Sequence, residues 1–184
     1  MERAEEKLGQ GCYITVHTNL SDELLAQLEA IDHEKFRQEL WYTHDEFLEK
    51  TRQKDFICFV LSVNDDPLAF LYGYDYHADP RGFFLDEVAT RIEGKGLGKI
   101  LITLLFVYCY ELGYSSVVLY TEDLDQEGRH LKEFYEHMGF HIETIDPNLG
   151  LVMRYSIEGK SLNTLYNRIM HREGGPFPPY LSRA

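Results

Sequence analysis

A turn with three glycines at alternate positions constrains this 184-residue chain more than any other feature. The turn, Gly94-Lys95-Gly96-Leu97-Gly98-Lys99, follows the strand-like segment from Phe83 to Thr90 and opens an apolar segment that ends near Leu112. Glycines leave room for a bulky anion to reach the first amides of a helix, which have no partner within the helix. The helix dipole and two lysines favour negative charge at the same place. The sequence therefore predicts a strand, an anion-binding turn and a helix in succession.

Two common phosphate-binding motifs do not fit the spacing of this turn. A P-loop has four residues between its first glycine and Gly-Lys-Ser/Thr, whereas Ile100 follows Lys99 here and the first glycine is one residue too close. The dinucleotide fingerprint GxGxxG also fails, because the third glycine comes one residue early. A tight strand-to-helix turn without a ligand stays open as the alternative.

The rest of the chain alternates strand and helix signals. Ser21 is a candidate N-cap, and Thr43 with Glu46 forms a candidate capping box. We expect an α/β (α+β) fold with a mixed, largely antiparallel sheet flanked by helices. The expected strands are residues 12–17, 56–63, 68–76, 83–90, 116–121, 140–145 and 151–157, and the expected helices are residues 22–30, 44–51, 100–112 and 129–138.

Length and composition predict one domain. A chain of this length with 44% hydrophobic residues can bury one sizeable core but is short for two. We expect the domain to cover residues 1–157. Residues 158–184 are expected to form a helix and a Pro-rich tail that packs on the domain or extends from it.

Charge, cysteines and hydropathy predict a cytoplasmic protein. A net charge of -13 disfavours nucleic acid and anionic membranes, and it suits either a cationic partner or plain solubility. Cys12, Cys58 and Cys109 form no CxxC pair and are expected to be small buried hydrophobes in a reducing compartment. The most apolar segment, residues 100–110, is too short for a membrane span, and the charged N-terminus is unlike a signal peptide. The oligomeric state is open, with a homodimer among the alternatives.

Three segments taken together resemble the signature of the GNAT superfamily of acyl-CoA N-acyltransferases. The family's pattern is a strand, then Gln/Arg-x-x-Gly-x-Gly/Ala at a helix start, and later a helix that ends in a Tyr-containing stretch before Gly-Phe. The resemblance covers residues 83–157 well and the first half only in its order of elements. The matching segments are Leu85-Asp86-Glu87-Val88-Ala89-Thr90, the glycine turn, and Phe134-Tyr135-Glu136-His137-Met138-Gly139-Phe140.

This resemblance implies acetyl-CoA as the acyl donor and a primary amine of a small molecule or a peptide as the acceptor. The backbone of Val88, Ala89 and Thr90 would bind the pantetheine arm, and the amides from Gly94 to Lys99 would bind the diphosphate. A splayed parallel strand pair, here Leu85 to Thr90 and Ser116 to Thr121, would hold this cofactor. No metal is expected, because Gly139 separates His137 from His141 and their rings need not share a face.

Two departures from the family pattern affect the cofactor site. In the register that best fits the glycines, Glu93 occupies the family's Gln or Arg position, and an acid beside a diphosphate is unfavourable. A shifted register places Arg91 there, and the sequence does not choose between the two. Gly128 stands where the family often has Asn, seven residues before its Tyr.

Candidate catalytic residues follow from the chemistry of amine acylation. An alkylamine has a pKa of about 10.4, so that keeping it neutral at pH 7 costs roughly 4 to 5 kcal/mol and a base would help. Asp86 and Glu87 are base candidates on opposite faces of one strand, with Glu122 in reserve. The resemblance assigns Tyr135 as the acid that protonates the departing sulfur and the N–H near Val88 as the oxyanion donor. The alternatives are a core-facing tyrosine and solvated or paired carboxylates.

The aromatic residues of the first half of the chain allow two interpretations. Alternate tyrosines on one strand are most often core packing. Together with aromatic residues nearby in the sequence, they could instead form a cage for an ammonium group. The residues concerned are Tyr72, Tyr74, Tyr76, Trp41 and Tyr42. For the whole chain, the two functional readings are an active N-acetyltransferase and a non-catalytic coenzyme A-binding or interaction module of the same fold.

Overall fold

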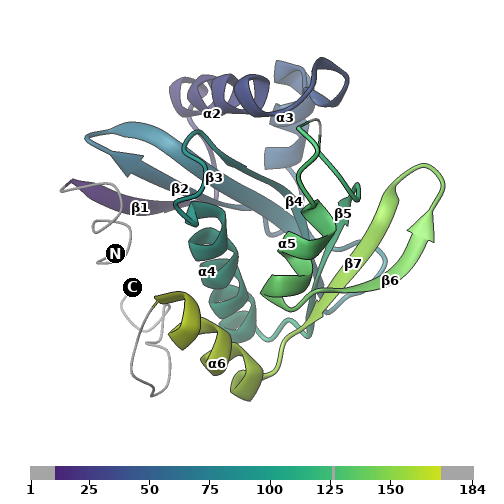
Figure 1. Cartoon of the computed structure of the whole chain (residues 1–184). Helices are drawn as coiled ribbons and strands as arrows, with labels where there is room; N and C mark the ends of the chain where they lie inside the picture. Colours follow the sequence, from purple (N-terminus) through teal and green to yellow (C-terminus); the bar gives the residue numbers. More distant parts are fainter. Residues whose placement is uncertain (1–10, 126, 171–184) are drawn as a thin grey trace. The chain divides into compact units, whose positions relative to one another are not determined.

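A computed structural model of the chain describes residues 11–125 and 127–170 (Figure 1). These residues form seven strands and five α-helices, with a short 3-10 helix at Gln38–Leu40. The strands are β1 (Cys12–His17), β2 (Ile57–Val63), β3 (Asp66–Asp75), β4 (Gly82–Thr90), β5 (Ser116–Thr121), β6 (His141–Asp146) and β7 (Gly150–Ser156). The helices are α2 (Asp22–Lys35), α3 (His44–Thr51), α4 (Leu97–Leu112), α5 (Leu131–Met138) and α6 (Gly159–Met170).

The seven strands form one sheet in the order β1-β2-β3-β4-β5-β7-β6. Its single parallel pair is β4 with β5, which pair through Gly82–Phe84 and Ser116–Val118, the first residues of each strand. The pairs β1–β2, β2–β3, β5–β7 and β6–β7 are antiparallel. The predicted α/β (α+β) fold, with a mixed and largely antiparallel sheet flanked by helices, is therefore confirmed.

Contacts along the chain define two compact units, and β4 and α4 each run through both. Among the described residues, the first unit holds 11–75 and 87–101, with β1, β2, β3, α2 and α3. In this unit α2 packs against β3 and α3, and both helices lie on the same side of the β1, β2 and β3 ribbons (Figure 1). Asn64 and Asp65 close the β2–β3 hairpin with φ of 51° and 67°, a left-handed conformation that Asn and Asp tolerate.

The helix starts of the first unit follow the predicted caps. The Ser21 side chain accepts a bond from the Leu24 N–H, and Thr43 and Glu46 form the reciprocal capping box. The end of α2 differs from the prediction, because the helix continues beyond Ala30 to Lys35. Basic residues in its last turn suit the negative end of the helix dipole.

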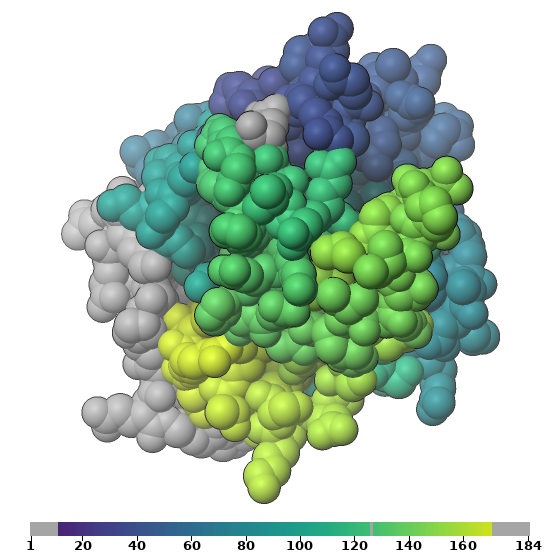
Figure 2. All heavy atoms as spheres, turned by 45° about the vertical axis from the view of Figure 1, so that its right-hand side comes forward, coloured from purple at the N-terminus to yellow at the C-terminus, as the bar shows by residue number. Residues whose placement is uncertain are grey.

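Among the described residues, the second unit holds 76–86, 102–125 and 127–170, with β5, β6, β7, α5 and α6. Its core contains the rings of Phe106 and Tyr155, which stack at 3.9 Å, with Phe140 beside them. Figure 2 shows the surface of this unit, where the β6–β7 hairpin in light green lies beside α5 in darker green. α5 begins at Leu131, two residues later than predicted, since Asp125 accepts the Arg129 N–H and forms an ion pair with the Arg129 side chain.

Several smaller predictions are tested by the described residues. All three cysteines are buried and form no disulfide, and burial raises the pKa of the Cys58 and Cys109 thiols. α6 lies within residues 158–184, where a helix and a Pro-rich tail were expected, and the tail from residue 174 lies outside the described residues. In the part of the chain that the structure describes, no helix has the length and hydropathy of a membrane span.

Candidate functional site

The glycine turn adopts the conformation that its glycines allow. Gly94 and Gly96 both have φ of 71°, which residues with a Cβ avoid. α4 begins at Leu97, and the Ile100 N–H donates to the Gly96 carbonyl at 3.2 Å. The amides that precede Ile100 in the first turn have no acceptor within the helix, so this end of α4 is suited to an anion.

The surroundings of the turn also fit a diphosphate. A Cβ placed on Gly94 would meet no heavy atom within 4 Å, so the space beside the turn is open. The first turn of α4 holds no acidic residue, and Lys95 is exposed to solvent while Lys99 is partly exposed. Open space, backbone amides and nearby ammonium groups are the features that an anion site needs.

Arg91 and Glu93, the two residues that compete for the family's Gln or Arg position, both bind side chains of α2. The Arg91 guanidinium holds Glu34 through two bonds of 3.0 and 3.1 Å, and it also donates to the Asp66 side chain and the Pro67 carbonyl. Glu93 accepts a bond of 3.2 Å from the Lys35 ammonium. The charge of Glu93 is therefore partly offset, and the Arg91 guanidinium is used in fixing the end of β4 to α2.

The structure shows how the two acids of β4, Asp86 and Glu87, differ in burial, which the sequence could not show. From Leu85 onward the side chains of β4 alternate between buried and partly exposed. Glu87 is buried, with 6% of its surface exposed, whereas Asp86 is partly exposed. Val88 and Thr90 are partly exposed like Asp86, whereas Ala89 is buried like Glu87. Glu122, the reserve candidate, is exposed after the end of β5.

A buried acid that the sequence reading missed lies beside Glu87. Asp32 of α2 is only 3% exposed, and its carboxyl group lies within hydrogen-bonding range of the Glu87 carboxyl group. Burial raises the pKa of Asp32 above its ordinary value, while the bond from Glu87 and the nearby His33 act in the opposite direction. The signal was present in the sequence: Asp32 stands four residues after Leu28, on the stripe that buries α2.

Tyr135 lies on α5 in a partly buried position. Its ring makes edge contacts with Phe134 at 5.1 Å and Phe140 at 5.7 Å, and Gly139 ends the helix with φ of 97°. Burial raises the pKa of the Tyr135 hydroxyl to about 12, so this group stays protonated at neutral pH. These contacts agree with the interpretation that the ring packs in the core. A catalytic role for the hydroxyl stays a prediction.

The aromatic residues of the first unit serve mainly as packing. Tyr72 is fully buried and its ring meets Phe47 edge-on at 5.1 Å, as the core reading predicts. Trp41 stacks on His33 at 4.3 Å. The ammonium of Lys50 lies 4.6 Å from the centre of the Tyr42 ring, so a cation of the chain itself already uses this aromatic surface.

The two histidines around Gly139 lie on different elements. His137 is on α5, where its Nδ1 atom lies 2.6 Å from the Glu133 carbonyl, and His141 begins β6. Across residues 11–125 and 127–170, no three His, Cys, Asp or Glu side chains group in a way that could hold a metal ion.

Solved structures of N-acetyltransferases share the fold. An aminoglycoside 6'-acetyltransferase type Ii matches with a TM-score of 0.68 at 22% identity, over 79% of this chain and 97% of that one. The PaiA N-acetyltransferase from Thermoplasma acidophilum, in complex with coenzyme A, matches with a TM-score of 0.64 at 17% identity, over 78% and 99%. The ribosomal-protein alanine N-acetyltransferase from Escherichia coli matches with a TM-score of 0.63 at 16% identity, over 79% and 95%.

Comparison at the level of sequence identifies the family. No curated protein matches the chain significantly. The family model described as Acetyltransferase (GNAT) family matches residues 20–140, which include β4, the glycine turn, α4 and α5. This match covers more than half of the chain, and its members are acetyltransferases that use acetyl-CoA. The chain therefore belongs to the GNAT acetyltransferase family.

Proposed function

We propose that this acetyltransferase moves the acetyl group of acetyl-CoA to a primary amine of a small molecule or a peptide. The observation that carries the proposal is the turn at Gly94 and Gly96, whose left-handed residues lead from β4 into the first turn of α4, where the amides have no acceptor within the helix. The family match supplies the reaction class. We also propose that one domain covering residues 1–157 performs the reaction, in a reducing compartment such as the cytoplasm.

Binding of the donor is assigned to backbone groups. The amides from Gly94 to Lys99 would hold the diphosphate, and the backbone of Val88, Ala89 and Thr90 would hold the pantetheine arm. Bound acetyl-CoA supplies a thioester carbonyl that an amine can attack. Neither Arg91 nor Glu93 is assigned a contact with the diphosphate, because both side chains bind partners on α2.

The base assigned to the reaction is Glu87. The acceptor enters as an ammonium ion at neutral pH, and its proton must leave before nitrogen can attack. Glu87 is buried away from bulk water, where a carboxylate is a stronger base than on the surface. Asp86 is the second candidate, on the more exposed side of β4. The N–H near Val88 is proposed to stabilise the charge that develops on the carbonyl oxygen.

Tyr135 is assigned to the departing sulfur. With a pKa of about 12, its hydroxyl is protonated at neutral pH and can donate a hydrogen bond to the thiolate as it leaves. The thiol of coenzyme A is a stronger acid than this tyrosine, because the reference pKa of a thiol is about 8.5. If Tyr135 gives its proton to the sulfur, the tyrosine must be protonated again. The amine nitrogen loses its second proton at this stage.

The acceptor is proposed from charge and from the range of similar folds. The chain carries a net charge of -13, which favours cationic molecules near its surface. The similar structures include an enzyme for aminoglycosides and one for an alanine of a ribosomal protein. Both small-molecule amines and peptide amines are therefore retained as acceptors.

A direct test is to incubate the full chain with acetyl-CoA and a panel of amines, and to measure thiol release and the mass of each amine. The panel contains an aminoglycoside, a polyamine, free amino acids and peptides with a free N-terminus. We expect at least one amine to gain the mass of one acetyl group, with one thiol released for each. If coenzyme A binds but no amine is acetylated, the alternative of a non-catalytic coenzyme A-binding module is supported instead.

A matched pair of glycine variants tests the role of the turn. Gly94 and Gly113 both have positive φ, at 71° and 83°, and a Cβ on either would meet nothing within 4 Å. We therefore expect Gly94→Ala and Gly113→Ala to cost similar stability, about 1 to 2 kcal/mol each. Only Gly94→Ala should weaken the affinity for coenzyme A, by about tenfold or 1.4 kcal/mol. Calorimetric titration measures the affinity, and equal affinities in the two variants would contradict the assignment.

A further inference from the structure

The first unit buries two carboxyl groups against each other. Asp32 comes from α2 and Glu87 from β4, with 3% and 6% of their surfaces exposed. Their carboxyl groups lie within hydrogen-bonding range of each other. An ionised carboxylate has only acceptor atoms, so a hydrogen bond between two carboxyl groups requires a proton on one of them.

The position of Asp32 makes this pairing informative. Leu25, Leu28 and Ile31 form the buried stripe of α2, and Asp32 occupies a place on it where an apolar side chain would be expected. A buried acid destabilises a core unless it is paired or neutralised. Lys35, the nearest cation of the following helical turn, binds Glu93. The interaction with Glu87, together with the Tyr42 N–H and the nearby His33, compensates for the burial of Asp32.

We propose that Asp32 and Glu87 share one proton, and that Asp32 is a positioning residue that holds the Glu87 carboxyl and sets the pH at which it can accept a proton. This inference rests on the proposed function, because it concerns the base of that reaction. It adds to the reaction a residue 55 positions away in sequence, which acts through the Glu87 carboxyl group.

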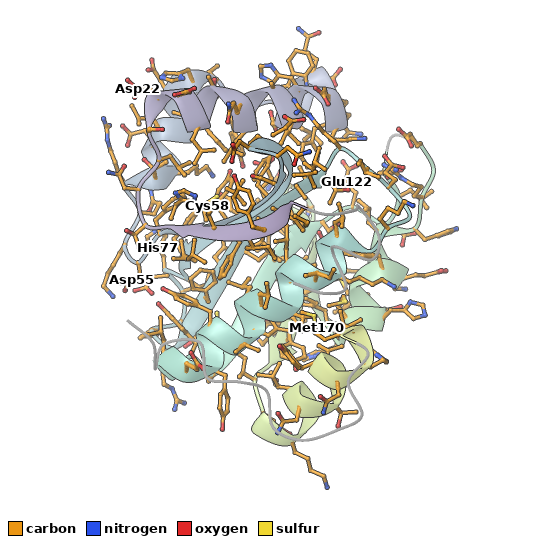
Figure 3. All side chains as sticks on the ribbon, turned by 90° about the vertical axis from the view of Figure 1, so that its left-hand side faces the viewer. Asp22, Asp55, Cys58, His77, Glu122 and Met170 are labelled. Carbon is orange, nitrogen blue, oxygen red and sulfur yellow. The ribbon has the colours of Figure 1, made fainter. Side chains whose placement is uncertain are left out.

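The groups that face the pair come from several elements. On α2, His33 lies 3.9 Å from Asp32 and Glu29 acts on it electrostatically. The backbone N–H of Tyr42, from the segment before α3, also bonds to Asp32. On β2, Cys58 is fully buried and interacts electrostatically with Glu87. In Figure 3 Cys58 lies among the packed side chains below the ribbon of α2.

These neighbours favour a pair with a single negative charge. Burial raises the pKa of Asp32, and the charge of Glu29 acts in the same direction, while His33 and the Tyr42 amide act against it. Burial and the charge of Glu87 both raise the pKa of the Cys58 thiol, so this thiol stays neutral beside the pair. Two such close carboxyl groups cannot both ionise readily, and they titrate as a unit.

The proton balance of the reaction follows from this state. The singly charged pair takes one proton from the ammonium form of the acceptor and becomes neutral. The free amine then forms its bond to the acetyl carbon as the carbon–sulfur bond breaks, and a second proton from nitrogen ends on the sulfur as the thiol. The pair afterwards releases its extra proton to water.

The direction of the stability change can be worked out in advance. Because the pKa of Asp32 is raised in the folded protein, the folded state keeps a proton that the unfolded chain loses above its ordinary pKa. Stability therefore falls as the pH rises from the unfolded pKa through the raised one. Asp32→Asn removes this loss, so the variant should be at least as stable as the wild type at neutral pH.

The test uses the full chain as wild type, Asp32→Asn, Glu87→Gln and the control Glu29→Gln, which removes a neighbouring charge that is paired with His44. Infrared difference spectra across pH measure the C=O band of a protonated carboxyl group. We expect this band at neutral pH in the wild type and in the control, and its loss in Asp32→Asn. The acid limb of the pH profile of kcat/KM should move up by about one unit in Asp32→Asn, because the charged Glu87 carboxylate loses a protonated carboxyl partner, and by less in the control.

The outcomes separate this proposal from the proposed function. Absence of the carboxyl band in the wild type at neutral pH, or an acid limb that does not move in a folded Asp32→Asn variant, would overturn proton sharing. A wild type that shows the band but acetylates no amine would refute the proposed function and with it the role of Asp32 in the reaction. A band that disappears in Asp32→Asn together with a shifted acid limb would support both.

Discussion

Glu87→Gln is expected to lower kcat/KM at neutral pH by about 10² to 10³-fold, the range in which removal of a general base falls. The amide keeps the size of the side chain, which is buried on β4, but it cannot accept a proton from an ammonium ion. The loss should shrink as the pH approaches the amine pKa of about 10.4, where the acceptor needs no base. Steady-state kinetics across pH with the amine identified by the panel would measure both effects.

Asp86→Asn is the matched control for this prediction. Asp86 precedes Glu87 on the same strand, carries the same functional group and is partly exposed. We expect this variant to keep nearly full activity, because its carboxylate lies on the other face of β4. A large loss in Asp86→Asn with full activity in Glu87→Gln would exchange the roles of the two acids.

Tyr135→Phe is expected to lower kcat by about 10²-fold and to leave the affinity for coenzyme A unchanged. The variant keeps the ring and its edge contacts with Phe134 and Phe140, so the packing of α5 is preserved. What is lost is a hydroxyl that burial keeps protonated, with a pKa of about 12. Pre-steady-state release of the thiol, measured alongside calorimetric affinity, separates the chemical step from binding.

Tyr114→Phe provides the control for Tyr135→Phe. Its ring also makes an edge contact, with Phe83 at 5.3 Å, and it is partly exposed like that of Tyr135. The control should turn over at the wild-type rate. If Tyr135→Phe did so too, the tyrosine would be a packing residue only, and another group or water would have to protonate the sulfur.

Local signals predicted the parts of the fold that local chemistry determines. The turn at Gly94 and Gly96 could be located because only glycine takes a left-handed conformation at little cost. The starts of α2 and α3 could be located because Ser21 and Thr43 cap amides within three residues of themselves. In each case the partners are close in sequence.

Partners that are distant in sequence account for what the sequence did not reveal. Glu34 and Arg91 bind each other although they are 57 positions apart in the sequence. Hydrophobic periodicity therefore could not show that the Arg91 side chain binds α2. Asp32 was passed over because the predicted helix ended at Ala30, two residues before it. The choice between Asp86 and Glu87 likewise needed the face that β4 buries, which depends on packing and not on the strand itself.

The central claim is that the amides at the start of α4 bind the diphosphate of coenzyme A. Hydrogen exchange of the full chain, measured with and without saturating coenzyme A, tests it most directly. Amides without a partner at a helix start exchange quickly, and a bound diphosphate would protect them. We predict slower exchange over residues 94–99 and 88–90 when coenzyme A is present. Unchanged exchange over residues 94–99, with protection at other segments or at none, would contradict the account.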